Sequence, residues 1–196
     1  MKKFIISFMM AAALVFSGSA AMAFSMEDLS GMYVTPKIGI GYVELDDIHG
    51  SNTGYSHGHD TAVVTGLSVG YDFSKDFEVP VRAELEYLYR GKTKTNLSNG
   101  NQIENEAHSV MVNAAYDFKE VPVVTPYITA GCGTAWLGDG GTNFAYNFGG
   151  GFYYNITENV SYDMSVRYVD YGSLNKSGYK VDQSGANIMV GVRYTF

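Results

Sequence analysis

Eight stretches of the chain alternate between apolar residues and residues that are small, polar or charged. A period of two residues is the pattern of a β-strand whose two faces meet different surroundings. The stretches are Tyr33–Leu45, Ala62–Phe73, Val81–Arg90, Ala107–Phe118, Thr125–Leu137, Phe144–Ile156, Val160–Tyr171 and Ser184–Phe196. Their lengths fit tilted strands that cross a membrane, each of which needs about 9–11 residues. The alternation therefore predicts an all-β protein with eight strands.

Within the membrane-spanning parts of these stretches, the apolar face carries no charged residue. In VRAELEYLYR (residues 81–90) the odd positions are Val, Ala, Leu, Tyr and Tyr, whereas Arg and Glu occupy even positions. The charged residues collected on the second face are Lys37, Arg82, Glu84, Glu86, Asp163, Arg167 and Arg193. An Arg or Lys at the lipid midplane costs about 2–4 kcal/mol, so these charges are expected to point inward. We predict that they form a polar network in the lumen, with the glycines of the same face leaving room for long side chains.

A soluble barrel or sandwich would show the same alternation with the opposite polarity. The surface of such a protein is usually rich in Lys and Glu, but charged residues are only 17% of this chain. In addition, Tyr and Phe on the apolar face gather towards the strand ends, as in the aromatic girdles of membrane barrels. The pattern therefore favours an eight-stranded antiparallel up-and-down transmembrane β-barrel.

The N-terminus has the three parts of a secretory signal peptide. Lys2 and Lys3 precede an apolar stretch, Phe4–Phe16, and Ala21-Met22-Ala23 is a typical cleavage site. We expect residues 1–23 to be removed and residues 24–196 to form an outer-membrane barrel domain. After residue 23 no stretch of 18 apolar residues predicts a membrane-spanning helix.

The connections between the predicted strands alternate in length. Three are short: Ser74–Pro80, Lys119–Val124 and Thr157–Asn159. Four are longer and polar or rich in glycine: Asp46–Thr61, Gly91–Glu106, Gly138–Asn143 and Gly172–Gln183. Short periplasmic turns alternating with longer outer loops are typical of membrane barrels.

A Tyr-Asp-Phe motif occurs twice, at residues 71–73 and 116–118, and each copy is followed by Val-Pro-Val. Both copies fall where a strand enters a short connection. We interpret them as markers of the periplasmic end, with the aromatic rings at the membrane interface. Asp72 and Asp117 are then expected to face the bottom of the lumen.

Composition excludes several kinds of partner. The formal net charge is −7, and an acidic chain without basic clusters does not bind nucleic acid, because binding requires neutralisation of phosphates. Cys132 is the single cysteine, so neither an intrachain disulfide nor a cysteine-based metal cluster is expected. No cofactor is predicted.

Three segments resemble those of small eight-stranded outer-membrane barrels of the opacity-protein and OmpA transmembrane-domain type. They are VRAELEYLYRG (81–91), TPYITAGCGTAWLG (125–138) and VGVRYTF (190–196). The resemblance covers the chain after the signal peptide and implies a location in the bacterial outer membrane. It further implies that Tyr194 and Phe196 form the terminal signal read by the barrel-assembly machinery. Members of that family include surface adhesins, structural proteins and narrow pores.

The lumen charges allow two interpretations. Glu84 and Glu86 can pair with Lys37, Arg167 or Arg193, and an exchange of partners would gate a narrow porin-like channel. Alternatively, the charges form a static network that fills the barrel and must satisfy each of its members. The second interpretation is favoured, because an eight-stranded lumen is normally filled by side chains.

Two further kinds of chemistry are weighed. His49, His57, His59 and Asp60 in the first long loop are weak candidates for a zinc or copper site, because their glycine-rich spacing imposes no geometry. A lipid-modifying enzyme is less favoured, because the neighbouring His108 and Ser109 point to opposite faces of a strand.

The outer loops remain as the functional surface, since binding residues often lie on loops held by a rigid scaffold. We therefore predict a non-enzymatic protein that serves as an envelope structural protein, as an adhesin, or as both. Its predicted partners are outer-membrane lipid and a host or surface ligand.

Overall fold

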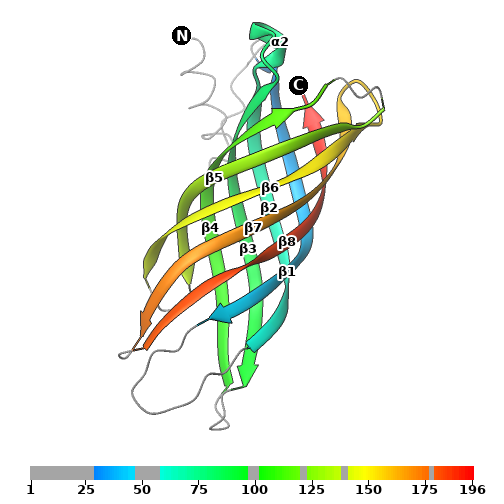
Figure 1. Cartoon of the computed structure of the whole chain (residues 1–196). Coiled ribbons are helices and arrows are strands. Elements are labelled where there is room, and N and C mark those ends of the chain that lie inside the picture. Colours follow the sequence, from blue (N-terminus) through cyan, green and yellow to red (C-terminus); the bar gives the residue numbers. More distant parts are fainter. Residues whose placement is uncertain (1–28, 47–57, 97–101, 120–122, 138–140, 177–178) are drawn as a thin grey trace, which may run out of the picture.

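The computed structural model is a closed barrel of eight antiparallel strands in which each strand pairs with its neighbours in sequence and β1 pairs with β8 (Figure 1). It describes residues 29–46, 58–96, 102–119, 123–137, 141–176 and 179–196. The strands are β1 Met32–Asp46, β2 Gly58–Asp72, β3 Val81–Asn96, β4 Gln102–Asp117, β5 Thr125–Leu137, β6 Thr142–Asn155, β7 Val160–Lys176 and β8 Tyr179–Thr195. The predicted fold class is confirmed. The predicted signal peptide, residues 1–23, lies outside the described residues.

Side chains of the predicted apolar face point away from the lumen. Ile38, Val112 and Phe148 are 55%, 54% and 55% exposed. The face with glycines and charges is turned inward, where Arg82 and Glu86 are 0% and 1% exposed. This polarity is that of a membrane barrel and opposite to that of a soluble one. No helix among the described residues is long and apolar enough to cross a membrane.

Several strands continue further into the outer connections than predicted, most of all β3, β4, β7 and β8. The ladder between β3 and β4 runs on past Arg90 to Asn96↔Gln102, and that between β7 and β8 runs on past Asp170 to Lys176↔Tyr179. The predicted loops Gly91–Glu106 and Gly172–Gln183 are therefore wrong over most of their length. The reason is that backbone pairing does not require apolar side chains once a strand has left the membrane.

A register irregularity marks the start of each extension. The pairing shifts between Arg90 and Thr93 on β3 and between Asp170 and Ser173 on β7. Gly172 has a positive φ of 75°, a conformation that is readily available only to glycine. Bulges of this kind bend a strand and are common at barrel rims, and here they divide the barrel wall from the outer hairpins.

The opposite end carries a short helix that the sequence did not predict. Helix α2, Ser74–Phe77, occupies the first short connection, and Glu78 ends it in the left-handed conformation. Asp72 accepts a hydrogen bond from the backbone N–H of Ser74 at 2.9 Å, which favours the turn into the helix. Asp72 lies on the inward face of β2, opposite Arg82 in the ladder, and is half-buried at the rim of the lumen.

Candidate functional site: the charged lumen

The half of the lumen near α2 holds a balanced set of charges. Its described members are four acidic residues, Glu84, Glu86, Asp117 and Asp163, and four basic residues, Lys37, Arg82, Arg167 and Arg193, all of them buried. They come from β1, β3, β4, β7 and β8. Charges removed from water require both pairing and hydrogen bonding, so the geometry of these pairs decides what the site can do.

Five ion pairs join most of these residues into one chain. Asp117 lies 2.9 Å from Nε of Arg82, and Arg82 lies 2.8 Å from Glu84. Lys37 then connects Glu84, at 3.4 Å, to Glu86, at 2.8 Å.

The last ion pair of this chain joins Glu86 to Arg167. The two guanidinium nitrogens Nη1 and Nη2 of Arg167 donate to the two carboxylate oxygens at 2.7 and 2.8 Å. A bidentate pair of this kind is stronger and more directional than a single contact. The pair also joins β3 to β7 across the lumen, so it holds opposite walls of the barrel together.

Tyrosines connect the remaining pair, Arg193 and Asp163, to the chain. Arg193 donates to Asp163 at 2.8 Å, and Tyr127 donates to the same carboxylate at 3.0 Å. The guanidinium of Arg193 also lies 4.7 Å from the ring centre of Tyr33 and 4.5 Å from that of Tyr153, within the range of cation–π attraction. Tyr33 in turn donates to Glu84 at 2.7 Å.

Two glycines make room for these rings. A Cβ at Gly70 would collide with the ring of Tyr33, and a Cβ at Gly151 would meet the Tyr127 ring at 2.8 Å and clash with the backbone oxygen of Met164. Alternation of glycines with long side chains therefore fills a lumen of this size without strain.

The lumen nearer the outer hairpins is largely apolar, with the buried guanidinium of Arg90 lying 4.6 Å from the ring centre of Tyr171. One buried cluster consists of Val64, Leu88 and Met189. A second consists of Ala107, Met111, Ala135, Ala145, Val169 and Tyr171. Together with the paired charges, these clusters make the described lumen a packed interior in which each layer is held by its own kind of contact.

All seven residues of the predicted lumen network lie buried and bonded in this interior. Glu84 and Glu86 meet Lys37, as the hypothesis of paired charges requires, but Arg193 pairs with Asp163 instead of either glutamate. Asp117, which was expected at the bottom of the lumen, is buried there and belongs to the network. The tyrosines at positions 33, 127 and 153 were not predicted as members. Their position on the glycine face was the available signal, because a tyrosine on that face cannot reach the membrane interface.

A sequence comparison decides the family. The model of the family described as "Outer membrane protein beta-barrel domain" matches residues 11–196. The chain belongs to this family. It is an outer-membrane β-barrel protein of bacteria.

This outer-membrane barrel matches a relative and solved structures over most of their length. It is 29% identical over 220 residues to outer membrane protein PagN of Salmonella typhimurium, an alignment that covers 85% of this chain and 90% of PagN. Neisserial surface protein A superposes with a TM-score of 0.64 at 21% identity, over 85% of this chain and 98% of that one. OprG from Pseudomonas aeruginosa superposes with a TM-score of 0.62 at 15% identity, over 85% and 96%. At these identities the two structures establish the fold alone.

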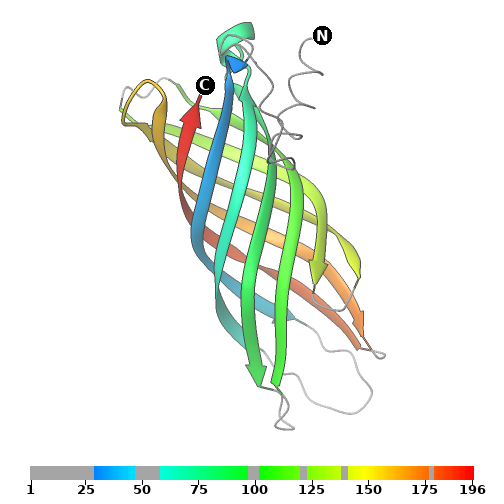
Figure 2. The ribbon, with the colours of Figure 1, turned by 180° about the vertical axis from the view of Figure 1, so that it is seen from behind.

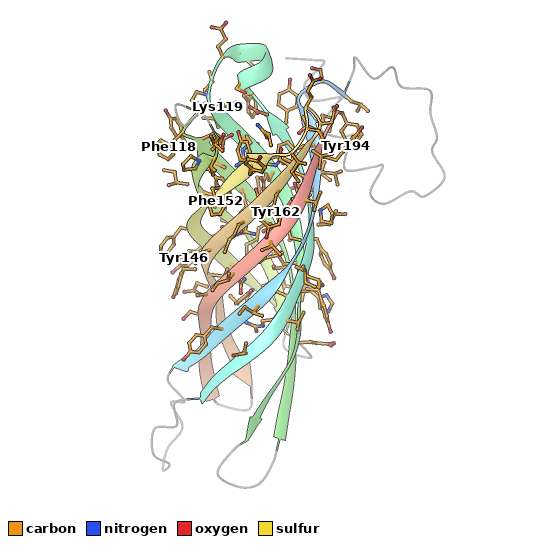
Figure 3. The ribbon with its side chains drawn as sticks, turned by 90° about the vertical axis from the view of Figure 1, so that its right-hand side faces the viewer. Phe118, Lys119, Tyr146, Phe152, Tyr162 and Tyr194 are labelled. Carbon is orange, nitrogen blue, oxygen red and sulfur yellow. The ribbon has the colours of Figure 1, made fainter. Side chains whose placement is uncertain are left out.

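Three strands of the outer-membrane barrel end in the same aromatic pair. Tyr71–Phe73, Tyr116–Phe118 and Tyr194–Phe196 each meet edge to face with ring centres 5.1 Å apart. Figure 3 shows Phe118 and Tyr194 at the end that carries α2, with Tyr146 further towards the other end. The Tyr-Asp-Phe motif is therefore the strand-end aromatic pair of β2 and β4, and β8 repeats it with a threonine in the middle.

The weak metal candidates cannot be assembled from the described residues. His49 and His57 lie outside them, and His59 and Asp60 are placed in β2 by their backbone while their side chains lie outside the described part. Among the described residues, no group of three or more His, Cys, Asp or Glu could hold a metal ion. A metal site in this loop therefore stays an untested prediction.

His108 and Ser109 lie on opposite faces of β4. Ser109 is 2% exposed inside the barrel, whereas Nδ1 of the outward-facing His108 is 2.7 Å from the hydroxyl of Tyr87. The imidazole therefore cannot act directly on the serine hydroxyl. Cys132 is exposed on the outer surface of the barrel.

Proposed function

We propose that this outer-membrane barrel is a non-conducting scaffold that acts as a structural protein of the envelope and as an adhesin. The observation that carries the proposal is the length of the outer hairpins above a filled lumen. β3 and β4 reach beyond the outer ends of β5 and β6 (Figure 2). A rigid barrel supporting projecting hairpins is suited to contact a partner outside the cell.

Unpaired strand edges add to this argument. Beyond Arg90 the described residues of β3 pair with β4 alone, and before Ala107 those of β4 pair with β3 alone. The β3–β4 hairpin thus stands apart from the barrel wall, with backbone donors and acceptors on both sides. Such edges bind extended polypeptides unless they are protected.

The alternative of a narrow channel gated by ion pairs has less support. Opening would require several of the buried pairs to separate, which would leave charges uncompensated in the interior and is therefore strongly unfavourable. Exchange within the charged half would also leave the apolar clusters nearer the hairpins in place. A catalytic role has no support in the placement of His108 and Ser109.

Adhesion is tested by removing the β3–β4 hairpin without disturbing the closed barrel. Because Thr93 and Asn105 are partners in the ladder, joining them by a short turn preserves the register below. Cells that carry the trimmed barrel should lose adhesion to surfaces that the parent binds. A control barrel keeps the full hairpin length but replaces residues 97–101 with Gly and Ser. Equal adhesion of the parent and the trimmed barrel would leave only the structural role.

Single-channel recording separates the scaffold from the channel. The refolded protein in a planar bilayer should give no stable open state. Regular openings that disappear in a Glu86→Gln variant would favour the gated channel instead.

A further inference from the structure

A group of aromatic and polar side chains faces outward near the outer end of the barrel wall. The ladder places Tyr89 on β3 opposite His108 on β4, and His108 opposite Trp136 on β5. The three side chains therefore form one row across adjacent strands. The row lies just before the irregularity at Arg90 and Thr93, at the end of the wall opposite to the Tyr-x-Phe pairs.

His108 is the unusual member of this row. The lipid-facing positions around it, Val110 and Val112 along β4, are apolar. An ionisable side chain on the membrane surface of a protein is expensive, and it usually marks a functional site.

The contacts of His108 fix its orientation. Its ring lies 4.9 Å from that of Tyr89 and 6.1 Å from that of Tyr87. The Tyr87 hydroxyl is 2.7 Å from Nδ1, so Nε2 is the nitrogen available to an external group. Tyr89 donates weakly to Glu106 at 3.5 Å. Together with its neighbours Tyr87 and Glu106, the row combines aromatic faces with an oriented imidazole, phenol hydroxyls and a carboxylate.

We propose that this row binds the saccharide headgroup of a glycolipid in the outer leaflet. Aromatic side chains at the end of a membrane-barrel wall lie at the depth of the headgroups. The row is also continuous with the lipid-contacting surface of the barrel. Sugar rings offer apolar faces to aromatic rings and hydroxyls to the surrounding donors and acceptors. The Glu106 carboxylate, which accepts from Tyr89 at this end of the row, disfavours a bare phosphate, since like charges would meet there. The site is distinct from the hairpins that carry the proposed adhesion.

The chain supplies its own reporter for a test. Trp136 is the single tryptophan and 39% exposed, so its emission reports on the row. The full barrel is placed in phosphatidylcholine nanodiscs containing increasing fractions of a synthetic glycolipid with an uncharged disaccharide headgroup. A saturable change in emission is expected. Phosphatidylglycerol with the same acyl chains, at the same fractions, should produce none.

Variants assign that change to the row. Tyr87→Phe keeps the ring but releases His108, and His108→Ala removes the imidazole. Either should raise the glycolipid fraction at half-saturation about tenfold, as expected for the loss of one hydrogen-bonding group. Tyr168→Phe, on the lipid-facing side of β7, is the matched control and should leave it unchanged. A response that never saturates, an equal response to phosphatidylglycerol, or equal behaviour of all variants would overturn the proposal.

Discussion

Glu86 lies at the centre of the lumen network, where its carboxylate serves several partners at once. It accepts hydrogen bonds from both terminal nitrogens of Arg167, at 2.7 and 2.8 Å, and from Lys37 at 2.8 Å. Ser68 and Asn113 donate to it at 3.3 and 3.4 Å. A carboxylate so placed matters less for its own pair energy than for the cations that would be left buried without it.

Replacement of Glu86 should therefore destabilise the barrel strongly. Glu86→Ala leaves Arg167 and Lys37 without their shortest contacts, and the expected loss in free energy of unfolding is about 3–5 kcal/mol. Urea-induced unfolding in lipid vesicles measures this loss. Glu158→Ala, in an exposed turn, is the control and should stay within about 0.5 kcal/mol of the parent. An equally small effect at Glu86 would contradict the static network.

The pair of Asp163 and Arg193 allows a cleaner measurement. Its salt bridge of 2.8 Å stands outside the chain of ion pairs, so a double-mutant cycle with Asp163→Asn and Arg193→Met isolates one interaction. The double variant should be less destabilised than the sum of the single variants, by about 0.5–3 kcal/mol. Additive effects would mean that Tyr127, Tyr33 and Tyr153 hold the two side chains independently.

At the scale of elements, the strand ends separate what a sequence can predict from what it cannot. The wall of the barrel was predictable because nearly all of its membrane-facing positions are apolar, and a run of charges there would have broken the pattern. That constraint disappears outside the membrane. The continuation of β3 to Asn96, the shift at Arg90 and helix α2 all lie beyond it, where pairing depends on backbone geometry alone.

The lumen lies between these two cases. Parity predicts that Lys37 and Glu86 point inward, but it cannot choose the partners, because several cations compete for each carboxylate. Arg193 illustrates this limit: Asp163 lies one strand away on β7, whereas the predicted glutamates are across the lumen. Partner choice follows from strand tilt and side-chain length, which a period of two residues does not contain.

The repeated aromatic pair provides a matched comparison between two strands. Tyr116–Phe118 and Tyr194–Phe196 share one geometry and differ in their place along the chain. If the C-terminal pair is also read by the assembly machinery, Phe196→Ala should reduce the amount of inserted barrel several-fold more than Phe118→Ala. Quantitative blots of outer-membrane fractions measure this difference. Equal effects would reduce both pairs to interface anchors, whose role is set by headgroup depth alone.

For the whole molecule, closure of the barrel and length of the outer hairpins are separate properties. Closure rests on the ladder between β1 and β8, which runs from Tyr33↔Thr195 to Asp46↔Asp182, and on the paired charges within. The β3–β4 extension contributes to neither, since the described residues above Arg90 have no ladder to a third strand. The barrel should therefore tolerate loss of this hairpin.

Removal of the hairpin above Thr93 and Asn105 should thus leave a barrel that still migrates as a heat-modifiable band in detergent. Folded and unfolded forms are separated by electrophoresis of unheated and boiled samples, and the temperature of the band shift measures stability. The trimmed barrel should convert within a few degrees of the parent, because no buried pair or apolar cluster is lost. A Glu86→Ala barrel with intact hairpins should convert at a clearly lower temperature. A lower conversion temperature for the trimmed barrel than for the Glu86→Ala barrel would mean that the outer hairpins, and not the charges in the lumen, hold the barrel closed.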